Sequence, residues 1–332
     1  MVFIDTPNNK ITDNKAIHQP QPTIIVLIPC YNEEVTIAKV VTDFKHELPE
    51  AQIIVLDNNS TDDSAQIAKQ AGAKIVSVLK QGKGAVIRYI FREIDADVYL
   101  IADGDGACPA SCAHDLISPI LKGFDMAMGD RLTEGSYVRE NKRRFHEVGN
   151  KLVCMLVNRC FNADIKDVMC GYRAFSKKFA KNIPILADGF QVETEMTIRC
   201  IDRKLPYVTV PVAFQNRPTG SVSKLHTVRD GFRVLATIFT ILKNYRPLLF
   251  FGMLSVIFLL LGLIFGIPVL REFFIYHRVT LAASAILATG LVLISAIFLI
   301  CALILDTFVS YERQRNELSI LQFGKREAKE RS

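Results

Sequence analysis

The chain has 332 residues, half of them hydrophobic, and a formal net charge of +6. This length fits one or two domains, and the mean hydropathy of +0.23 is high for a wholly soluble protein. The mild charge suits a membrane surface or a phosphate-bearing substrate. We expect no nucleic-acid partner, because the chain lacks a compact basic stripe with interleaved aromatic residues. Its eight cysteines form no C-x-x-C pair, which favours free thiols over zinc ligands.

Residues 1–22 are polar and rich in Asn, Gln, Pro and Asp. They contain no apolar segment of the signal-peptide kind, so we expect a mobile N-terminal tail. After this tail, short β-branched runs alternate with helical patterns. The expected strands are at residues 23–28, 52–56, 74–78 and 97–102. This alternation predicts an α/β domain over residues 23–225 with a parallel, doubly wound sheet.

Three polar clusters follow the expected strands, at residues 31–34, 57–60 and 103–105. The carboxyl ends of such strands share one edge of the sheet, where ligands collect. Asp103 and Asp105 offer two carboxylates to Mg²⁺ or Mn²⁺, which would neutralise a departing diphosphate. The same D-x-D pattern by itself fits an ordinary turn equally well, and the strand before it favours the metal site.

Lys83 stands between two glycines at the start of an expected helix. Backbone N–H groups and the helix dipole attract anions at such a position. The pattern therefore favours a phosphate near Lys83, although a lysine in a glycine turn is common.

Two segments near the C-terminus, residues 247–270 and 279–305, contain no charged residue. Each is long enough to cross a bilayer as a helix, and the alternative is a pair of very hydrophobic core helices. Their short connection makes them a transmembrane hairpin. Basic residues flank both outer ends, so we expect the α/β domain and both termini in the cytoplasm.

Residues 226–246 have an amphipathic pattern. We expect a juxtamembrane helix lying on the membrane surface, with packing against the α/β domain as the alternative. Residues 306–332 are expected to form a basic cytoplasmic tail.

Four motifs in this order resemble the family 2 glycosyltransferases of the GT-A fold: PCYNEE at 29–34, DNNSTD at 57–62, QGKG at 81–84 and DGD at 103–105. The rest of the chain resembles the polyprenyl-phosphate branch, which includes dolichol-phosphate mannose synthases and bactoprenol glucosyltransferases. That likeness is carried by residues 129–131, 143–144, 167–173, 191–193 and 217–224. The two C-terminal spans resemble the bactoprenol glucosyltransferase type.

The resemblance implies roles for individual residues. The donor would be held by Pro29, Tyr31, Glu33, Asp57, Lys83, Asp103, Gly104 and Gln191. Metal would bind Asp103 and Asp105. Donor or lipid phosphates would be gripped by Arg131, Arg143, Arg144, Arg217 and Lys224. Catalysis would depend on Asp105, Arg131, Arg144 and Glu193, with Gln191 and Glu193 facing the sugar. One departure is Gly106-Ala107, where relatives often carry a third polar group, so the third metal ligand is open.

The implied reaction moves a hexose from a nucleotide-sugar, UDP-glucose before GDP-mannose, to undecaprenyl or dolichyl phosphate. A lipid monophosphate is largely dianionic at neutral pH and needs no strong base, which favours one inverting displacement. Transfer to a lipid-linked saccharide, with Glu193 as base, is one alternative, and a non-catalytic membrane scaffold is another. The relatives' surface helix and hairpin also suggest a homo-oligomer.

Overall fold

The structure, a computed structural model, describes the chain except for residues 1–20, 134–143, 190, 214–235, 237–238 and 332. The described residues of the N-terminal part form a seven-stranded sheet with the order β3-β2-β1-β4-β6-β5-β7. The strands are β1 (Ile24–Cys30), β2 (Gln52–Asp57), β3 (Lys74–Ser77), β4 (Val98–Ile101), β5 (Met126–Asp130), β6 (Arg173–Ser176) and β7 (Tyr207–Pro211).

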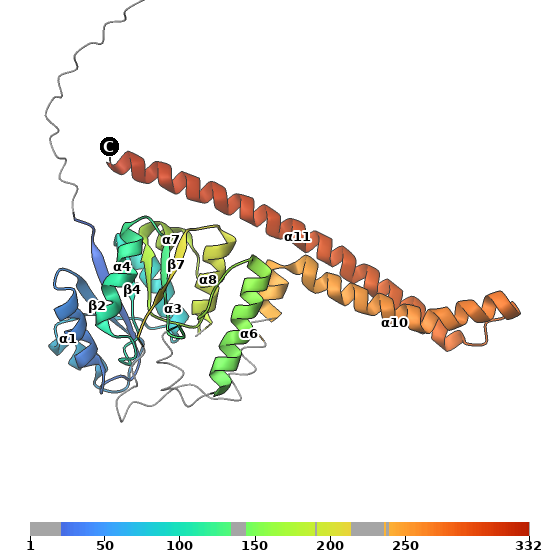
Figure 1. The fold of residues 1–332 in the computed structure, drawn as a ribbon, viewed down its shortest axis with the longest axis horizontal. Helices are drawn as coiled ribbons and strands as arrows, with labels where there is room; N and C mark the ends of the chain where they lie inside the picture. The colour runs from blue at the N-terminus through green and yellow to red at the C-terminus, as the bar shows by residue number, and fades with distance from the viewer. Residues whose placement is uncertain (1–20, 134–143, 190, 214–235, 237–238, 332) are drawn as a thin grey trace, which may run out of the picture.

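Helices cover both faces of the sheet (Figure 1). Apolar side chains of α1, α2 and α4 form a core with one face, and those of α3, α6, α7 and α8 form a second core with the other. The helices are α1 (Ile37–Glu47), α2 (Ser64–Gln70), α3 (Lys83–Glu93), the short 3₁₀ helix η1 (Ala110–Cys112), α4 (Ala113–Leu121), α6 (Arg144–Phe161), α7 (Lys177–Asn182), α8 (Val192–Asp202), α10 (Pro247–Tyr276) and α11 (Ala282–Arg331).

The central strand β1 shows why its sequence is apolar at successive positions. Ile25 and Leu27 belong to one core, whereas Val26 and Ile28 belong to the other. A strand covered by helices on both faces needs apolar side chains on both. The α/β class and the four expected strands are confirmed, with ends that differ by one or two residues.

One strand departs from the expected parallel sheet. Strand β6 runs antiparallel to both β4 and β5. The sequence predicts a loop, and no strand, where β6 begins. It has only four residues and begins with a fully buried arginine, Arg173. A strand this short with a charged first residue lacks the apolar run that marks a buried strand.

Helices α10 and α11 form a hairpin that projects away from the sheet (Figure 1). Both are candidate membrane spans, and only 11% and 17% of the residues in their most apolar windows are buried. This exposure argues against the alternative of two core helices, because core helices bury their apolar side chains. Inside the hairpin, the hydroxyls of Ser255 and Ser295 lie 3.1 Å apart.

The second long helix continues past the apolar run. Residues 306–331, expected as a separate basic tail, are helical and continuous with α11. Arg313 of this continuation forms an ion pair of 2.8 Å with Asp202 of α8. Residues 1–20 of the expected N-terminal tail lie outside the described residues, and so does most of the expected surface helix of residues 226–246. Residues 239–245 of that segment are helical.

Arg173 is the largest fully buried side chain of the described residues. Its guanidinium donates to the carbonyls of Cys170 and Val168, both at 2.7 Å, and to Thr197 Oγ1 at 2.8 Å. Burial lowers the pKa of this guanidinium from its usual value, while nearby Glu193 opposes that shift. Arg173 thereby ties the turn before β6 to helix α8.

We therefore expect the Arg173→Met variant to lose about 3 kcal/mol of folding stability, because two buried carbonyls lose their charged donor. The measurement is the thermal midpoint of the purified full chain in detergent. Arg92→Met is the matched control, since the Arg92 side chain is 81% exposed and its ion pair among the described residues is with its neighbour Glu93. Equal midpoints for both variants would contradict the structural role of Arg173.

Candidate functional site

The site is built where β1, β2 and β4 end side by side. The N–H of Asn58 donates to the Cys30 carbonyl at 2.8 Å, and that of Ala102 donates to the Leu27 carbonyl at 3.1 Å. The three polar clusters expected from the sequence therefore meet at one edge, as the parallel pairing of these strands requires.

The turn after β1 is fastened to the two neighbouring turns. The Glu33 N–H donates to Ser64 Oγ at 2.7 Å, and Thr36 Oγ1 donates to the Gly104 carbonyl at 2.7 Å. Asp57 accepts a hydrogen bond from the Ser60 N–H at 3.2 Å, and Tyr31 is 37% exposed at the rim. Three of the residues expected to hold a nucleoside thus share a fixed frame: Tyr31 and Glu33 on the turn after β1, and Asp57 at the end of β2.

Gly104 lies close to the end of β1. A Cβ at this position would come within 3.4 Å of the Pro29 carbonyl oxygen and of an Ile37 methyl carbon. The glycine lets the D-x-D turn lie directly against Pro29, another expected donor residue.

At the centre of the site, Lys83 joins two carboxylates from distant segments. Its Nζ lies 2.5 Å from Asp103 Oδ1 at the end of β4 and 2.7 Å from Glu193 Oε1 in the first turn of α8. Burial alone would lower the pKa of Lys83, but the charges of Asp103 and Glu193 outweigh it and raise the pKa above its usual value. The two carboxylates therefore favour the charged ammonium form of Lys83.

Glu193 is 3% exposed, and its second oxygen, Oε2, has no hydrogen-bond partner among the described residues. A buried carboxylate oxygen without a donor is costly. A ligand hydroxyl would supply that donor, which agrees with the expected contact between Glu193 and the sugar.

Gly171 packs directly on the ion pair. A Cβ at this position would lie 2.6 Å from Asp103 Oδ2 and 2.7 Å from Lys83 Nζ. The backbone before β6 therefore forms one wall around the lysine and leaves no space there for a side chain.

The turn that presents Lys83 is held by residues that the sequence did not single out. Asn58 Oδ1 accepts from the Gly82 N–H at 2.7 Å, while Asn58 Nδ2 donates to the carbonyls of Val78 and Lys80 at 2.9 and 2.8 Å. On the other side, the Gly84 N–H donates to the Asp188 carbonyl at 3.0 Å. The buried side chain of Asn58 thus connects the segment after β3 to the glycine turn through hydrogen bonds.

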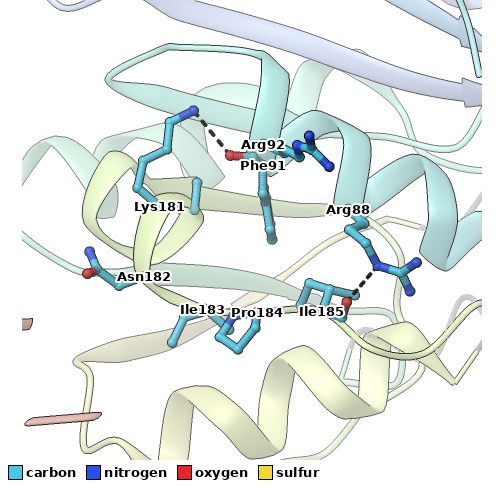
Figure 2. A pocket seen from close by; sticks show the side chains of 9 residues that line it. Arg88, Phe91, Arg92, Lys181, Asn182, Ile183, Pro184 and Ile185 are labelled. Atoms are coloured by element: carbon cyan, nitrogen blue, oxygen red, sulfur yellow. Dashed lines mark hydrogen bonds between the residues drawn. The ribbon is translucent and has the colours of Figure 1, made fainter. Parts of the chain in front are cut away.

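Arg88 holds the segment that faces these glycines. Its Nε donates to the Ile185 carbonyl at 2.7 Å (Figure 2), and its Nη2 contacts the Asp188 carboxylate at 2.9 Å. A Cβ at Gly84 would lie 1.9 Å from the Ala187 carbonyl oxygen. Segment 187–188 packs so closely on Gly82 and Gly84 that neither position has room for a side chain. The sequence did not indicate that Arg88 holds this segment, because a single arginine in a helix is common.

Arg131 is fixed by a two-point ion pair. Its Nε and Nη2 donate to the two oxygens of Asp167 at 2.7 and 3.0 Å, and Asn150 Nδ2 donates to Asp167 at 2.9 Å. Burial would raise the pKa of the Asp167 carboxyl, but Arg131 and Asn150 lower it below its usual value. Arg131 therefore stands as a pre-oriented cation on the segment after β5.

The donor set fits a hard divalent cation. Asp105 is 7% exposed, and one of its oxygens accepts from the Ala107 N–H at 3.0 Å. Asp103 and Asp105 follow directly after β4, and their carboxylate oxygens are of the ligand type that hard divalent cations prefer. The described residues contain no group of three His, Cys, Asp or Glu arranged to hold a metal, so Asp103 and Asp105 would need oxygen ligands from diphosphate or water.

The remaining expected residues are placed less fully. Gln191 is exposed at the N-cap of α8, with its Oε1 2.8 Å from where a Cβ on Gly189 would lie. Arg144 is the first residue of α6, but its side chain lies outside the described part. Arg143, Arg217 and Lys224 also lie outside it, so their phosphate contacts stay predictions.

Residues 25–183 match the family model described as glycosyl transferase family 2. The glycosyltransferase AglJ of Haloferax volcanii is 30% identical over 305 residues, which cover 89% of this chain and 97% of that protein. The chain belongs to glycosyl transferase family 2. A polyprenol monophosphomannose synthase of Mycolicibacterium smegmatis is 27% identical over 226 residues, 64% of this chain and 84% of that one.

The fold of this glycosyltransferase is GT-A. Glucosyl-3-phosphoglycerate synthase from Mycobacterium tuberculosis, solved with Mn²⁺, UDP-glucose and phosphoglyceric acid, superposes with a TM-score of 0.53 at 24% identity. The match covers 67% of this chain and 79% of that one. The expected fold class and family are thereby confirmed.

We expect Gly171→Ala to lower glycosyltransferase activity by about 100-fold, because the new methyl group pushes Lys83 and Asp103 apart and small misplacements at a reacting centre are costly. Steady-state transfer from radiolabelled nucleotide-sugar measures the effect. Gly252→Ala is the matched control, since a Cβ at Gly252 meets nothing within 4 Å. Full activity of Gly171→Ala would show that the ion pair has no part in the site.

Proposed function

We propose that this glycosyltransferase transfers a hexose from a nucleotide-sugar to a polyprenyl phosphate and inverts the anomeric configuration. The proposal rests on the presence of two features in the same chain. One is the charged cluster of Lys83, Asp103 and Glu193 at the strand ends, and the other is the pair of candidate membrane spans. The cluster suits a charged, hydroxyl-rich donor, and the spans suit an acceptor that stays in the membrane.

The donor side follows from the frame of the site. The nucleoside would be held at the carboxyl ends of β1 and β2 and on the turn after β1, by Pro29, Tyr31, Glu33 and Asp57. Glu193 would accept a hydrogen bond from a sugar hydroxyl through Oε2, which has no donor among the described residues, with Gln191 beside it. The ion pair with Lys83 holds Glu193 in place for that contact.

We propose Mg²⁺ or Mn²⁺ at Asp103 and Asp105. When bound, the ion would neutralise charge on the leaving diphosphate. Support comes from the two carboxylates that directly follow β4 and from the Mn²⁺ and Mg²⁺ named for structures of glucosyl-3-phosphoglycerate synthase.

The acceptor side needs cations rather than a base. A monophosphate with a second pKa near 6 is mostly dianionic at pH 7, so its oxygen can attack the anomeric carbon directly. The work left to the protein is to hold two anions close together. Arg131, held in orientation by Asp167, is the described residue best prepared for this, and Arg143, Arg144, Arg217 and Lys224 are proposed to join it.

The acceptor class is supported by relatives whose names state it, including the polyprenol monophosphomannose synthase and a dolichyl-phosphate hexose transferase of Haloferax volcanii. We favour UDP-glucose as donor, from the two-span C-terminus, and GDP-mannose as the second candidate. The basic residues at the outer ends of the spans support a catalytic domain facing the cytoplasm. The hairpin also supports a homo-oligomer as a proposal.

Asp105→Asn removes one proposed metal ligand while it keeps the size of the side chain. We expect at least a 100-fold loss of kcat/KM, the order seen when one electrostatic group is removed from a reacting centre, and an added dependence on high Mn²⁺ concentration. Asp115→Asn is the control, because Asp115 is exposed on α4. Unchanged transfer by Asp105→Asn, with unchanged circular dichroism, would remove the metal role from this residue.

The overall reaction is tested by incubating the purified full chain with UDP-glucose or GDP-mannose and with either undecaprenyl phosphate or a lipid-linked saccharide. We expect transfer to the bare polyprenyl phosphate, and NMR of the product should show the inverted anomer. Retained configuration would contradict a single displacement. Preference for the lipid-linked saccharide would instead favour Glu193 as a base for a hydroxyl acceptor.

A further inference from the structure

A cavity of about 450 Å³ lies where the α/β domain meets the candidate spans. We call it the interface cavity, and the lining residues used here are Arg159, Phe161, Arg246, Leu248, Leu249 and Asp306. They come from the C-terminal end of α6, the start of α10 and the middle of α11. None of them belongs to the donor site described above.

The position of the cavity relative to a membrane follows from the spans. Arg246 immediately precedes α10, the first span, and Asp306 immediately follows the apolar run of α11. The two residues therefore mark the same membrane surface on antiparallel helices. Phospholipid phosphates lie at this level, and Leu248 and Leu249, 44% and 47% exposed, lie on the side of the hydrocarbon.

The cationic wall of the cavity is pre-oriented. The Arg246 guanidinium donates from Nη2 to the Cys160 carbonyl and lies over the Phe161 ring, 5.4 Å from its centroid. Its Nε is buried without a hydrogen-bond partner, and Arg246 forms no ion pair with any described residue. Arg159 adds a second, exposed guanidinium. Guanidinium groups held in this way are suited to phosphate oxygens.

One carboxylate shares the cavity with the two arginines. Asp306 has no ion pair within the described chain, although arginines line the same space. A ligand with both a phosphate and a primary amine would match both signs of charge, since an ammonium group donates three hydrogen bonds to oxygen. A purely anionic head group would leave Asp306 facing negative charge.

We propose that the interface cavity binds the head group of a phosphoethanolamine lipid, with its phosphate at Arg159 and Arg246 and its amine at Asp306. The acyl chains would descend along Leu248 and Leu249. The inference rests on membrane insertion of the two spans, but it does not depend on which sugar or acceptor the enzyme uses.

The test uses the full chain, purified in mild detergent and titrated with phosphatidylethanolamine, phosphatidylglycerol or phosphatidylcholine, with bound lipid counted by native mass spectrometry. We expect phosphatidylethanolamine to bind most tightly. Arg159→Ala should weaken it by about tenfold, as expected for one lost charge-assisted contact. Asp306→Asn should reduce it to the level of phosphatidylcholine. Arg278→Ala, in the hairpin connection at the other end of the spans, is the control and should bind like the wild type.

Equal binding of the three lipids would overturn the proposal, and so would the absence of a difference between Arg159→Ala and Arg278→Ala. Displacement by millimolar inorganic phosphate would indicate a site for free anions and would overturn it as well. Displacement by an equimolar amount of undecaprenyl phosphate would assign the cavity to the acceptor and would also overturn it. Arg159 is exposed, so its variant should fold, and thermal midpoints check this. A chain that does not enter membranes at all would instead contradict the proposed function.

Discussion

The largely buried ammonium of Lys83 is the constraint on which the site depends. Burying a lysine is costly unless carboxylates contact it, and here those carboxylates come from the end of β4 and from α8. The lysine itself begins α3, and Gly171 closes over it from the turn before β6. One charge therefore fixes four segments that lie far apart in the chain, and it fixes them where donor groups are expected.

The surroundings of Lys83 keep this arrangement in register. Asn58 holds the glycine turn from the side of β2 and β3, and Arg88 holds the opposing segment at Ile185. Arg173, deeper in the same region, links the turn before β6 to α8, which carries Glu193. Each of these polar side chains is buried or half-buried and donates hydrogen bonds to backbone carbonyls. The charged groups of the site are therefore supported by polar side chains whose own hydrogen bonds are formed.

The candidate membrane spans are connected to this frame through α8 and α6. Arg313 of the long helix α11 pairs with Asp202 at the end of α8, and Arg246 at the start of α10 contacts the end of α6. Helix α8 carries Glu193 and helix α6 begins at Arg144. The helices that enter the candidate bilayer are thus joined to the same elements that carry expected sugar and phosphate contacts, which suits a donor in water and an acceptor in a membrane.

The sequence by itself determined the alternating α/β pattern, the three polar clusters at strand ends and the two apolar spans, because each depends on local periodicity or on a run of like residues. It also placed Lys83, Asp103 and Glu193 in one expected site through the family motifs. Only the tertiary structure decided that Lys83 pairs with both carboxylates, that Asn58 and Arg88 hold its turn, and that β6 runs antiparallel. These features depend on contacts between residues 20 to 110 positions apart in the sequence. Such contacts produce no repeating pattern of residue types that could be recognised from the sequence.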